Sequence, residues 1–133
     1  MAVAKLPIDY MREAPFEHKW TALRRKCVKE GIPFDLTPDY LESIWTGTCP
    51  VFHTRLHKPF HSTNAERNGK HTSSLDRVVP AKGYTKGNVE WVSNYANIIK
   101  QKATSEELRK VADHVAMREK EIARYEANRD RPD

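Results

Sequence analysis

The sequence predicts an α+β fold, in which a small unit of two strands and one helix is flanked by helices on both sides. Three observations predict it. Apolar side chains recur at helical spacing in the first third of the chain, residues 74–102 read as strand, loop, strand and helix, and a helix start signal precedes the charged C-terminal segment. With 133 residues, the chain is expected to form one domain.

Residues 15–47 are predicted to form a helical N-terminal part. The segment FEHKWTALRRKCVKE, residues 16–30, spaces its apolar side chains as a helix does, and Gly31 is a plausible stop. Thr37 is placed to cap a second helix, with Pro38 at its first position. This second helix is expected to end near Gly47.

Residues 48–102 are predicted to contain an irregular hairpin over 48–60, a polar loop over 61–73 and then the two-strand unit. The first strand is expected from Ser74 to Val79, where Pro80 closes it. After the loop AKGYTKG, a second strand is expected from Val89 to Val92. Ser93 is placed to cap a helix that reaches about Lys102.

Residues 103–133 are predicted to form a C-terminal helix that begins with a capping box of Thr104 and Glu107. Its apolar side chains fall on one side, at Leu108, Val111, Val115 and Ile122. The distal segment REKEIARYEANRDRPD is mostly charged, so it is expected to be solvated and to fray before its end.

The positive charge is concentrated in the middle of the chain. Residues 1–52 hold seven Lys/Arg and seven Asp/Glu, residues 53–102 hold nine against three, and residues 103–133 hold seven against eight. The whole surplus therefore surrounds the two-strand unit. Such a patch suits the phosphates of nucleic acid, although a basic solvated surface alone would look the same.

Composition also limits the cellular setting. Mean hydropathy is −0.78, and no apolar run approaches the ~20 residues of a membrane span. The N-terminal residues show no apolar signal-peptide segment. The two cysteines, Cys27 and Cys49, are expected to be reduced thiols. We expect a cytoplasmic protein that does not use a membrane.

Three polar side chains stand out in the two-strand unit. Asp76 offers a carboxylate near the end of the first strand, and Asn97 offers an amide oxygen one turn into the following helix. A hairpin that folds back onto that helix brings the two together. One carboxylate and one neutral oxygen, with other positions left to water and phosphate, suit Mg²⁺. Asn88, after Gly87, is placed to tie the loop to the first strand.

The segment SLDRVVPAKGYTKGNVEWVSNYANIIK resembles the HNH endonuclease motif, the ββα-metal finger. The likeness is strongest to phage-type members that read LDR…GY..GNV.WV…N..K. The upstream stretch GIPFDLTPDYLESIWTGTCPVFHTRL is also similar to what precedes that motif, so the resemblance covers roughly residues 30–108.

The resemblance implies roles for individual residues. Asp76 and Asn97 would be metal ligands for one Mg²⁺ or Mn²⁺, and Asn88 would organise the loop. Together with Arg77 they would form the catalytic group. The expected contacts to nucleic acid are Arg77, Lys58, Lys70, Lys82, Lys86, Lys100 and Lys102.

The chain departs from the family in two ways. Many HNH proteins hold zinc with a Cys pair in the hairpin and another near the helix, whereas this chain keeps only Cys49 there, so a four-Cys site is impossible. The series Cys49, His53, His57 and His61 is an alternative zinc site, but histidines in a basic loop are more often phosphate contacts or plain surface. Structural zinc is therefore not expected.

The second departure is Arg77, which stands where most HNH motifs carry the histidine that acts as general base. A guanidinium cannot accept a proton at neutral pH, but it can grip a phosphate and offset transition-state charge. Candidates for the base are His53, His57, His61 and His71, together with Tyr84 and Tyr95. His71 lies ~20 Å from Arg77 in a continuous strand, so it needs a kink at Ser73–Ser74. Metal-bound hydroxide or a substrate phosphate oxygen would make a side-chain base unnecessary.

The resemblance therefore implies a metal-dependent DNA endonuclease, phage-like and active in a bacterial cytoplasm, which nicks duplex DNA one strand at a time. Two alternatives stay open: a nucleic-acid-binding protein that kept the finger without catalysis, and a phage protein that binds another protein through its acidic C-terminal helix. We expect a monomer or a weak dimer, for which double-strand cleavage requires a dimer or two sequential nicks.

Overall fold

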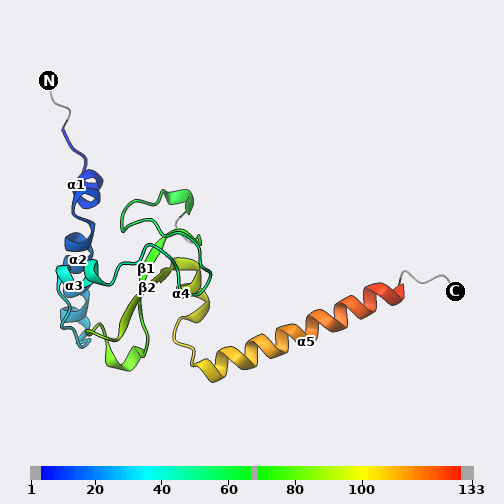
Figure 1. Cartoon of the computed structure of the whole chain (residues 1–133). Coiled ribbons are helices and arrows are strands. Elements are labelled where there is room, and N and C mark those ends of the chain that lie inside the picture. The colour runs from blue at the N-terminus through cyan, green and yellow to red at the C-terminus, as the bar shows by residue number, and fades with distance from the viewer. Residues whose placement is uncertain (1–3, 67–68, 130–133) are drawn as a thin grey trace. The chain divides into compact units, whose positions relative to one another are not determined.

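The structure is a computed structural model that describes residues 4–66 and 69–129. It confirms a mixed α+β chain, with helices and one small antiparallel sheet of two strands (Figure 1). The chain divides into two compact units, one up to Ile99 and one from Lys100 onward. The first unit contains the sheet and the candidate site.

Two helices open the first unit: α1, Pro7–Glu13, and α2, Pro15–Glu30. The sequence did not predict α1. Pro7 occupies its first turn, and Asp9 Oδ2 accepts the Leu6 N–H at 2.9 Å, but the helix buries no residue and so lacks an apolar pattern. The prediction of α2 is confirmed, and Gly31 ends it in the left-handed conformation with φ 69°.

Helix α3, Pro38–Ser43, begins where the sequence predicts and ends earlier. The Tyr40 N–H donates to Thr37 Oγ1 at 3.1 Å, so the predicted cap is confirmed. The predicted end near Gly47 is wrong. The Trp45 ring instead lies edge-on to Phe16 and Trp91, with ring centroids 5.8 and 5.3 Å away. Tertiary packing of this side chain thus replaces the expected last turn.

The segment between α3 and the sheet is largely irregular, as predicted. A single antiparallel bridge joins Thr48 to Arg55, and a parallel bridge joins His57 to Thr72. The polar loop also contains the short 3-10 helix η1, Asn64–Glu66.

Strands β1, Ser73–Arg77, and β2, Val89–Ser93, pair antiparallel, with Asp76 opposite Glu90. Strand β1 ends two residues before the predicted Val79. The Asn88 side chain takes both backbone groups of Val79, accepting its N–H at 3.0 Å and donating to its carbonyl at 2.9 Å. The chain then enters the 3-10 helix η2, Pro80–Lys82.

The two faces of the hairpin contact different elements. On the face of Leu75 and Trp91, the Trp91 indole donates to the Leu41 carbonyl of α3 at 3.0 Å, and its ring lies 5.9 Å from Phe16 of α2. On the other face, helix α4, Asn94–Lys100, folds back onto β1 (Figure 1). The hairpin therefore lies between α2 and α3 on one side and α4 on the other.

Helix α4 starts as predicted and is shorter than predicted. The Ala96 N–H donates to Ser93 Oγ at 3.0 Å, which confirms the cap. The helix ends at Lys100 rather than Lys102, because Gln101 adopts a left-handed conformation with φ 42°.

The second unit contains helix α5, Ser105–Arg129. Its predicted capping box is confirmed: Glu107 N–H donates to Thr104 Oγ1 at 3.1 Å, and Thr104 N–H donates to Glu107 Oε1 at 2.9 Å. None of its described side chains is buried, as expected for a solvated helix. The helix continues to Arg129, and the rest of the end expected to fray lies outside the described residues. Over the described residues, the helices lack the combination of length and apolar character that a membrane crossing requires.

Candidate metal and nucleic-acid site

Asp76 is a buried carboxylate on the face of the hairpin that receives α4. Its residue is 6% exposed, and it lies opposite Glu90 in the strand register. Side chains two apart in a strand share a face, so Ser74 lies on the same side as Asp76. Among the described residues, every buried side-chain nitrogen and oxygen has a hydrogen-bond partner, so this burial is compensated.

Asn97 reaches the same face from α4. Its Nδ2 donates to Ser74 Oγ at 2.9 Å, two residues before Asp76 in β1. The predicted folding of the helix back onto the first strand is therefore present. Ser74 was not singled out from the sequence, because only its tertiary contact with Asn97 distinguishes it from other strand serines.

The chemistry of this pair fits a hard divalent cation. Asp76 offers carboxylate oxygens, and the Asn97 amide, whose nitrogen faces Ser74, has one oxygen to offer. Mg²⁺ is held by few protein oxygens and keeps several waters, so an Asp and an Asn on one face are a sufficient protein contribution. The described residues contain no group of three or more His, Cys, Asp or Glu that could hold a metal ion. A site here thus depends on the Asp–Asn pair.

Asn88 organises the loop between the strands. Besides its two hydrogen bonds to Val79, its Nδ2 donates to the Gly83 carbonyl at 2.7 Å. The residue is 7% exposed, and one amide thus satisfies three backbone groups of the loop. The amide therefore ties the loop to Val79, two residues past the end of β1, which the sequence had predicted to be the last residue of the first strand. All three of these hydrogen bonds are to backbone groups. Within the predicted catalytic set, Asn88 would therefore position the loop rather than react.

The same loop is held from outside by the segment before α3. The Tyr84 N–H donates to the Pro33 carbonyl at 3.0 Å, and Lys86 N–H donates to Asp35 Oδ1 at 2.7 Å. The Tyr40 hydroxyl accepts the Gly87 N–H at 2.8 Å. The sequence indicated none of these contacts, because they join residues about fifty positions apart.

Arg77 ends β1 and lies on the face opposite to Asp76, because adjacent strand residues alternate. Its guanidinium carbon lies 5.1 Å from the ring centroid of Tyr84, a buried residue that is 8% exposed. A cation over an aromatic face is held by the ring quadrupole. The stack fixes a permanent positive charge at the edge of the hairpin nearest the loop.

The candidate histidine bases lie toward the other end of the hairpin. His57 bridges to Thr72, just before β1, and its ring stacks on that of His71 with centroids 5.9 Å apart. Ser73 and Ser74 both pair with β2, so the kink that would bring His71 to Arg77 is not present.

The remaining histidines have other partners. His61 Nε2 lies 3.0 Å from the carbonyl of Arg12, at the end of α1. His53 lies in the tight turn after Cys49 with φ 60°, and its N–H donates to the Cys49 carbonyl at 2.8 Å.

A hydrogen bond from the Thr63 backbone, with a smaller contribution from the charge of His57, lowers the pKa of Glu66.

The two tyrosines considered as bases are also packed by aromatic and cationic neighbours. Tyr84 lies under Arg77, and Tyr95 pairs with Phe52 at a centroid distance of 5.4 Å. The Lys70 ammonium lies 5.2 Å from the Phe52 ring and 5.5 Å from the Tyr95 ring.

Cys49 packs against the start of α4 as a hydrogen-bonded thiol. Its Sγ accepts the Ser93 N–H at 3.3 Å and lies 3.5 Å from Ser93 Oγ. Burial alone would raise the pKa of the Cys49 thiol, but hydrogen bonds from Ser93, Phe52 and Val51 lower it overall. Burial raises the pKa of the Cys27 thiol, and both cysteines are free. In the alternative zinc series, Cys49 and His61 thus have separate partners.

The lysines expected to contact nucleic acid occur in both units. In the first unit, Lys82 ends η2, Lys86 lies over the Tyr40 ring at 5.8 Å, and Lys70 covers the Phe52–Tyr95 pair. Lys58 of the same unit lines a pocket beside Trp45. Lys100, the last residue of α4, and Lys102, which follows it, belong to the second unit.

Comparisons of the chain with protein-family models, with curated proteins and with solved structures gave no match.

Proposed function

We propose that this protein is a metal-dependent DNA endonuclease of the HNH type, which hydrolyses phosphodiester bonds in duplex DNA one strand at a time. The observation that carries the proposal is that Asn97 of α4 donates to Ser74 on the face of β1 that also carries Asp76, two residues further along the strand. The motif resemblance and the basic charge of residues 53–102 support it.

In this proposal different residues of the chain bind the metal, position the loop and bind phosphate. Asp76 and Asn97 hold one Mg²⁺ or Mn²⁺, which when bound lowers the pKa of water and neutralises phosphate charge. Asn88 keeps the loop in shape, and the Arg77 guanidinium binds a phosphate oxygen while Tyr84 holds it in place. The lysines of the loop and of α4 bind neighbouring phosphates.

We assign proton transfer to no histidine, because His57 and His71 stack on each other, His61 contacts the Arg12 carbonyl and His53 is held in the turn after Cys49. This favours a water whose proton leaves to solvent or to a phosphate oxygen of the substrate. One competing function is a nucleic-acid-binding protein without catalysis. Arg77 favours this alternative, because it stands where the family usually carries the general base. Cleavage separates the two functions.

The test is incubation of the purified protein with supercoiled plasmid and Mg²⁺ or Mn²⁺. We expect conversion to nicked circles that EDTA abolishes. Asp76→Ala and Asp76→Asn should lower the nicking rate by a factor of about 100 or more, because they remove the charged ligand. Asp39→Asn, which neutralises an exposed carboxylate at the start of α3, is the matched control and should cut as the wild type does.

Circular dichroism must show that the Asp76 variants remain folded. If the wild-type protein leaves the plasmid intact with both metals but still binds DNA, the binding function replaces the nuclease. If Asp76→Ala cuts at the wild-type rate, the metal assignment is wrong.

A further inference from the structure

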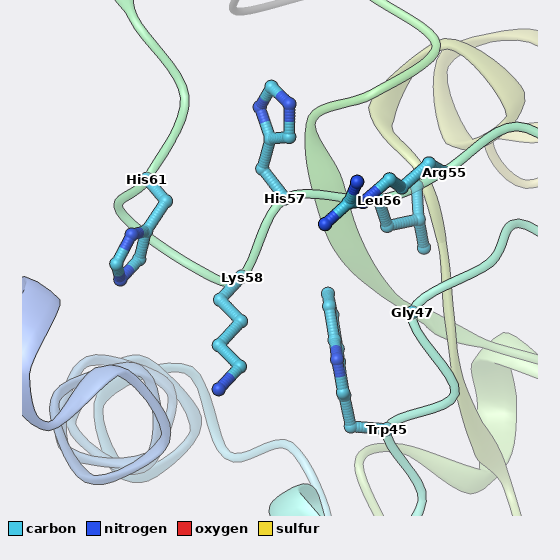
Figure 2. A pocket seen from close by; sticks show the side chains of 7 residues that line it. All are labelled: Trp45, Gly47, Arg55, Leu56, His57, Lys58 and His61. Atoms are coloured by element: carbon cyan, nitrogen blue, oxygen red, sulfur yellow. The ribbon is translucent and has the colours of Figure 1, made fainter.

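A basic pocket lies outside the proposed metal site, on the Trp91 side of the hairpin. It has a volume of about 630 Å³ and is lined by Trp45, Gly47, Arg55, Leu56, His57, Lys58 and His61 (Figure 2). The Trp45 ring contacts Trp91, whose side of the hairpin faces away from Asp76 and Asn97. The pocket is therefore separate from the Asp–Asn pair.

The polar side chains of this pocket are all hydrogen-bond donors or histidines. Arg55 and Lys58 carry fixed positive charge, and none of the seven lining residues carries a carboxylate. The nearby acidic group is Glu66, whose Oε2 lies 3.6 Å from His57 Nδ1. A ligand of this pocket must therefore bring negative charge, and a phosphate matches a guanidinium and an ammonium together.

The Trp45 ring forms a flat apolar wall of this pocket. Figure 2 shows the Arg55 side chain extending toward the Trp45 ring, the Lys58 side chain running alongside the ring, and the His57 ring pointing away from it. Trp45 is only partly buried, although its ring packs on Phe16 and Trp91. An aromatic ring flanked by two cations is the arrangement with which proteins bind a stacked base and its phosphate.

We propose that this pocket binds one unpaired base of a nucleic-acid strand and the neighbouring phosphates, with the base against Trp45 and the phosphates contacting Arg55 and Lys58. A volume of about 630 Å³ falls in the range of small-ligand sites, large enough for a nucleotide. The inference rests on the proposed function and deepens it, because it names a second contact with DNA, made to a base that is unpaired or turned out of the duplex, but it needs neither the metal nor cleavage.

The net charge of the surrounding chain supports this choice of pocket. A second hollow on α2 also places cations beside an indole, with Trp20, Arg24, Arg25 and Lys29 in its lining. Residues 1–52, which contain that hollow, have no net charge, whereas residues 53–102 have six positive charges in excess. The α2 hollow therefore provides a matched control of similar composition.

The test measures binding of a fluorescein-labelled single-stranded oligothymidylate by fluorescence polarisation, in EDTA so that no cleavage occurs. Arg55→Ala combined with Lys58→Ala should weaken binding about tenfold or more, since it removes both phosphate contacts. Arg24→Ala combined with Lys29→Ala removes the same charge from α2 and should weaken it far less. Thermal unfolding checks that both double variants are folded.

Tryptophan fluorescence tests the stacking separately. The oligonucleotide should quench the wild-type emission, and Trp45→Phe, which keeps an aromatic side chain against Phe16 and Trp91, should lose most of that quenching. The proposal is overturned if the two double variants weaken binding equally, or if Trp45→Phe is quenched like the wild type. Because binding is measured in EDTA, wild-type protein that binds the oligonucleotide but leaves plasmid intact contradicts only the proposed nuclease, and wild-type protein that nicks plasmid while the Arg55/Lys58 double variant binds as tightly contradicts only the pocket.

Discussion

Arg77 carries a permanent charge in a fixed position. Its guanidinium stacks on Tyr84, and Tyr84 is held by the backbone of Pro33, so the cation is placed by a chain of contacts rather than by a flexible stem. The residue therefore has the properties of a phosphate clamp and not those of a base, because a guanidinium keeps its protons at neutral pH.

Variants of Arg77 should separate its charge from its shape. Arg77→Ala should lower the plasmid nicking rate about 100-fold, the usual effect of removing one donor to transition-state charge, and Arg77→Lys should lose less because it keeps the charge. Arg24→Ala is the matched control, since it removes another stacked arginine, 5.5 Å from the Trp20 ring. Equal nicking by Arg77→Ala and the wild-type protein would show that Arg77 is a surface residue only.

At the scale of elements, the loop that joins β1 to β2 is the best-determined part of the site. Asn88 ties it from inside and Pro33, Asp35 and Tyr40 tie it from outside. Gly83 has φ 71° and ψ −162°, a conformation that other residues rarely adopt. A Cβ atom there would also lie 2.4 Å from the Pro33 carbonyl oxygen. The close approach of the loop to this segment thus requires glycine.

Gly83 and Gly87 form a matched pair for testing this close approach. Both have positive φ, but a Cβ at Gly87 would meet no atom within 4 Å. Gly87→Ala should therefore cost about 1–2 kcal/mol of unfolding free energy from backbone strain alone. Gly83→Ala should cost about 2–5 kcal/mol, because the clash with Pro33 adds to that strain. Urea unfolding measures both, and equal losses would contradict the close contact.

At the scale of the whole molecule, the charge is divided unevenly between segments. The surplus lies in residues 53–102, whereas residues 103–133, which include α5, have one negative charge in excess. Helix α5 exposes all of its described side chains except the half-buried Leu108, and several of them are lysines and arginines interspersed with glutamates. Binding to DNA phosphates is therefore expected to depend on the first unit and the end of α4.

Salt dependence of duplex DNA binding measures this division. The logarithm of the association constant should fall linearly with the logarithm of salt concentration, by about 0.9 per neutralised phosphate. Replacing both Lys82 and Lys86 with alanine should reduce that slope by about 2 and weaken binding at low salt. The control removes Lys110 and Lys120 of α5 and should leave the slope nearly unchanged. An equal effect of both pairs on the slope would mean that DNA binding depends on the total charge of the protein and not on the position of these lysines.

The sequence by itself determined the elements whose signals lie within a few residues. The Thr37 and Ser93 caps, the Thr104–Glu107 capping box and the Gly31 stop each depend on partners no more than about one helical turn away, so they were predictable. The existence of the two strands followed from apolar runs bounded by turn residues.

Tertiary structure alone decided the features that join distant residues. Helix α1 buries no residue and so shows no apolar periodicity in the sequence. Strand β1 ends early because the Asn88 side chain hydrogen-bonds the backbone of Val79. Helix α3 ends early where the Trp45 ring packs on Phe16 and Trp91. The link of Asn97 to Ser74 and the gathering of Arg55 and Lys58 around Trp45 also appear only in three dimensions. Such contacts depend on which surfaces the folded chain brings together, and the spacing of residues along the sequence does not specify which distant residues meet.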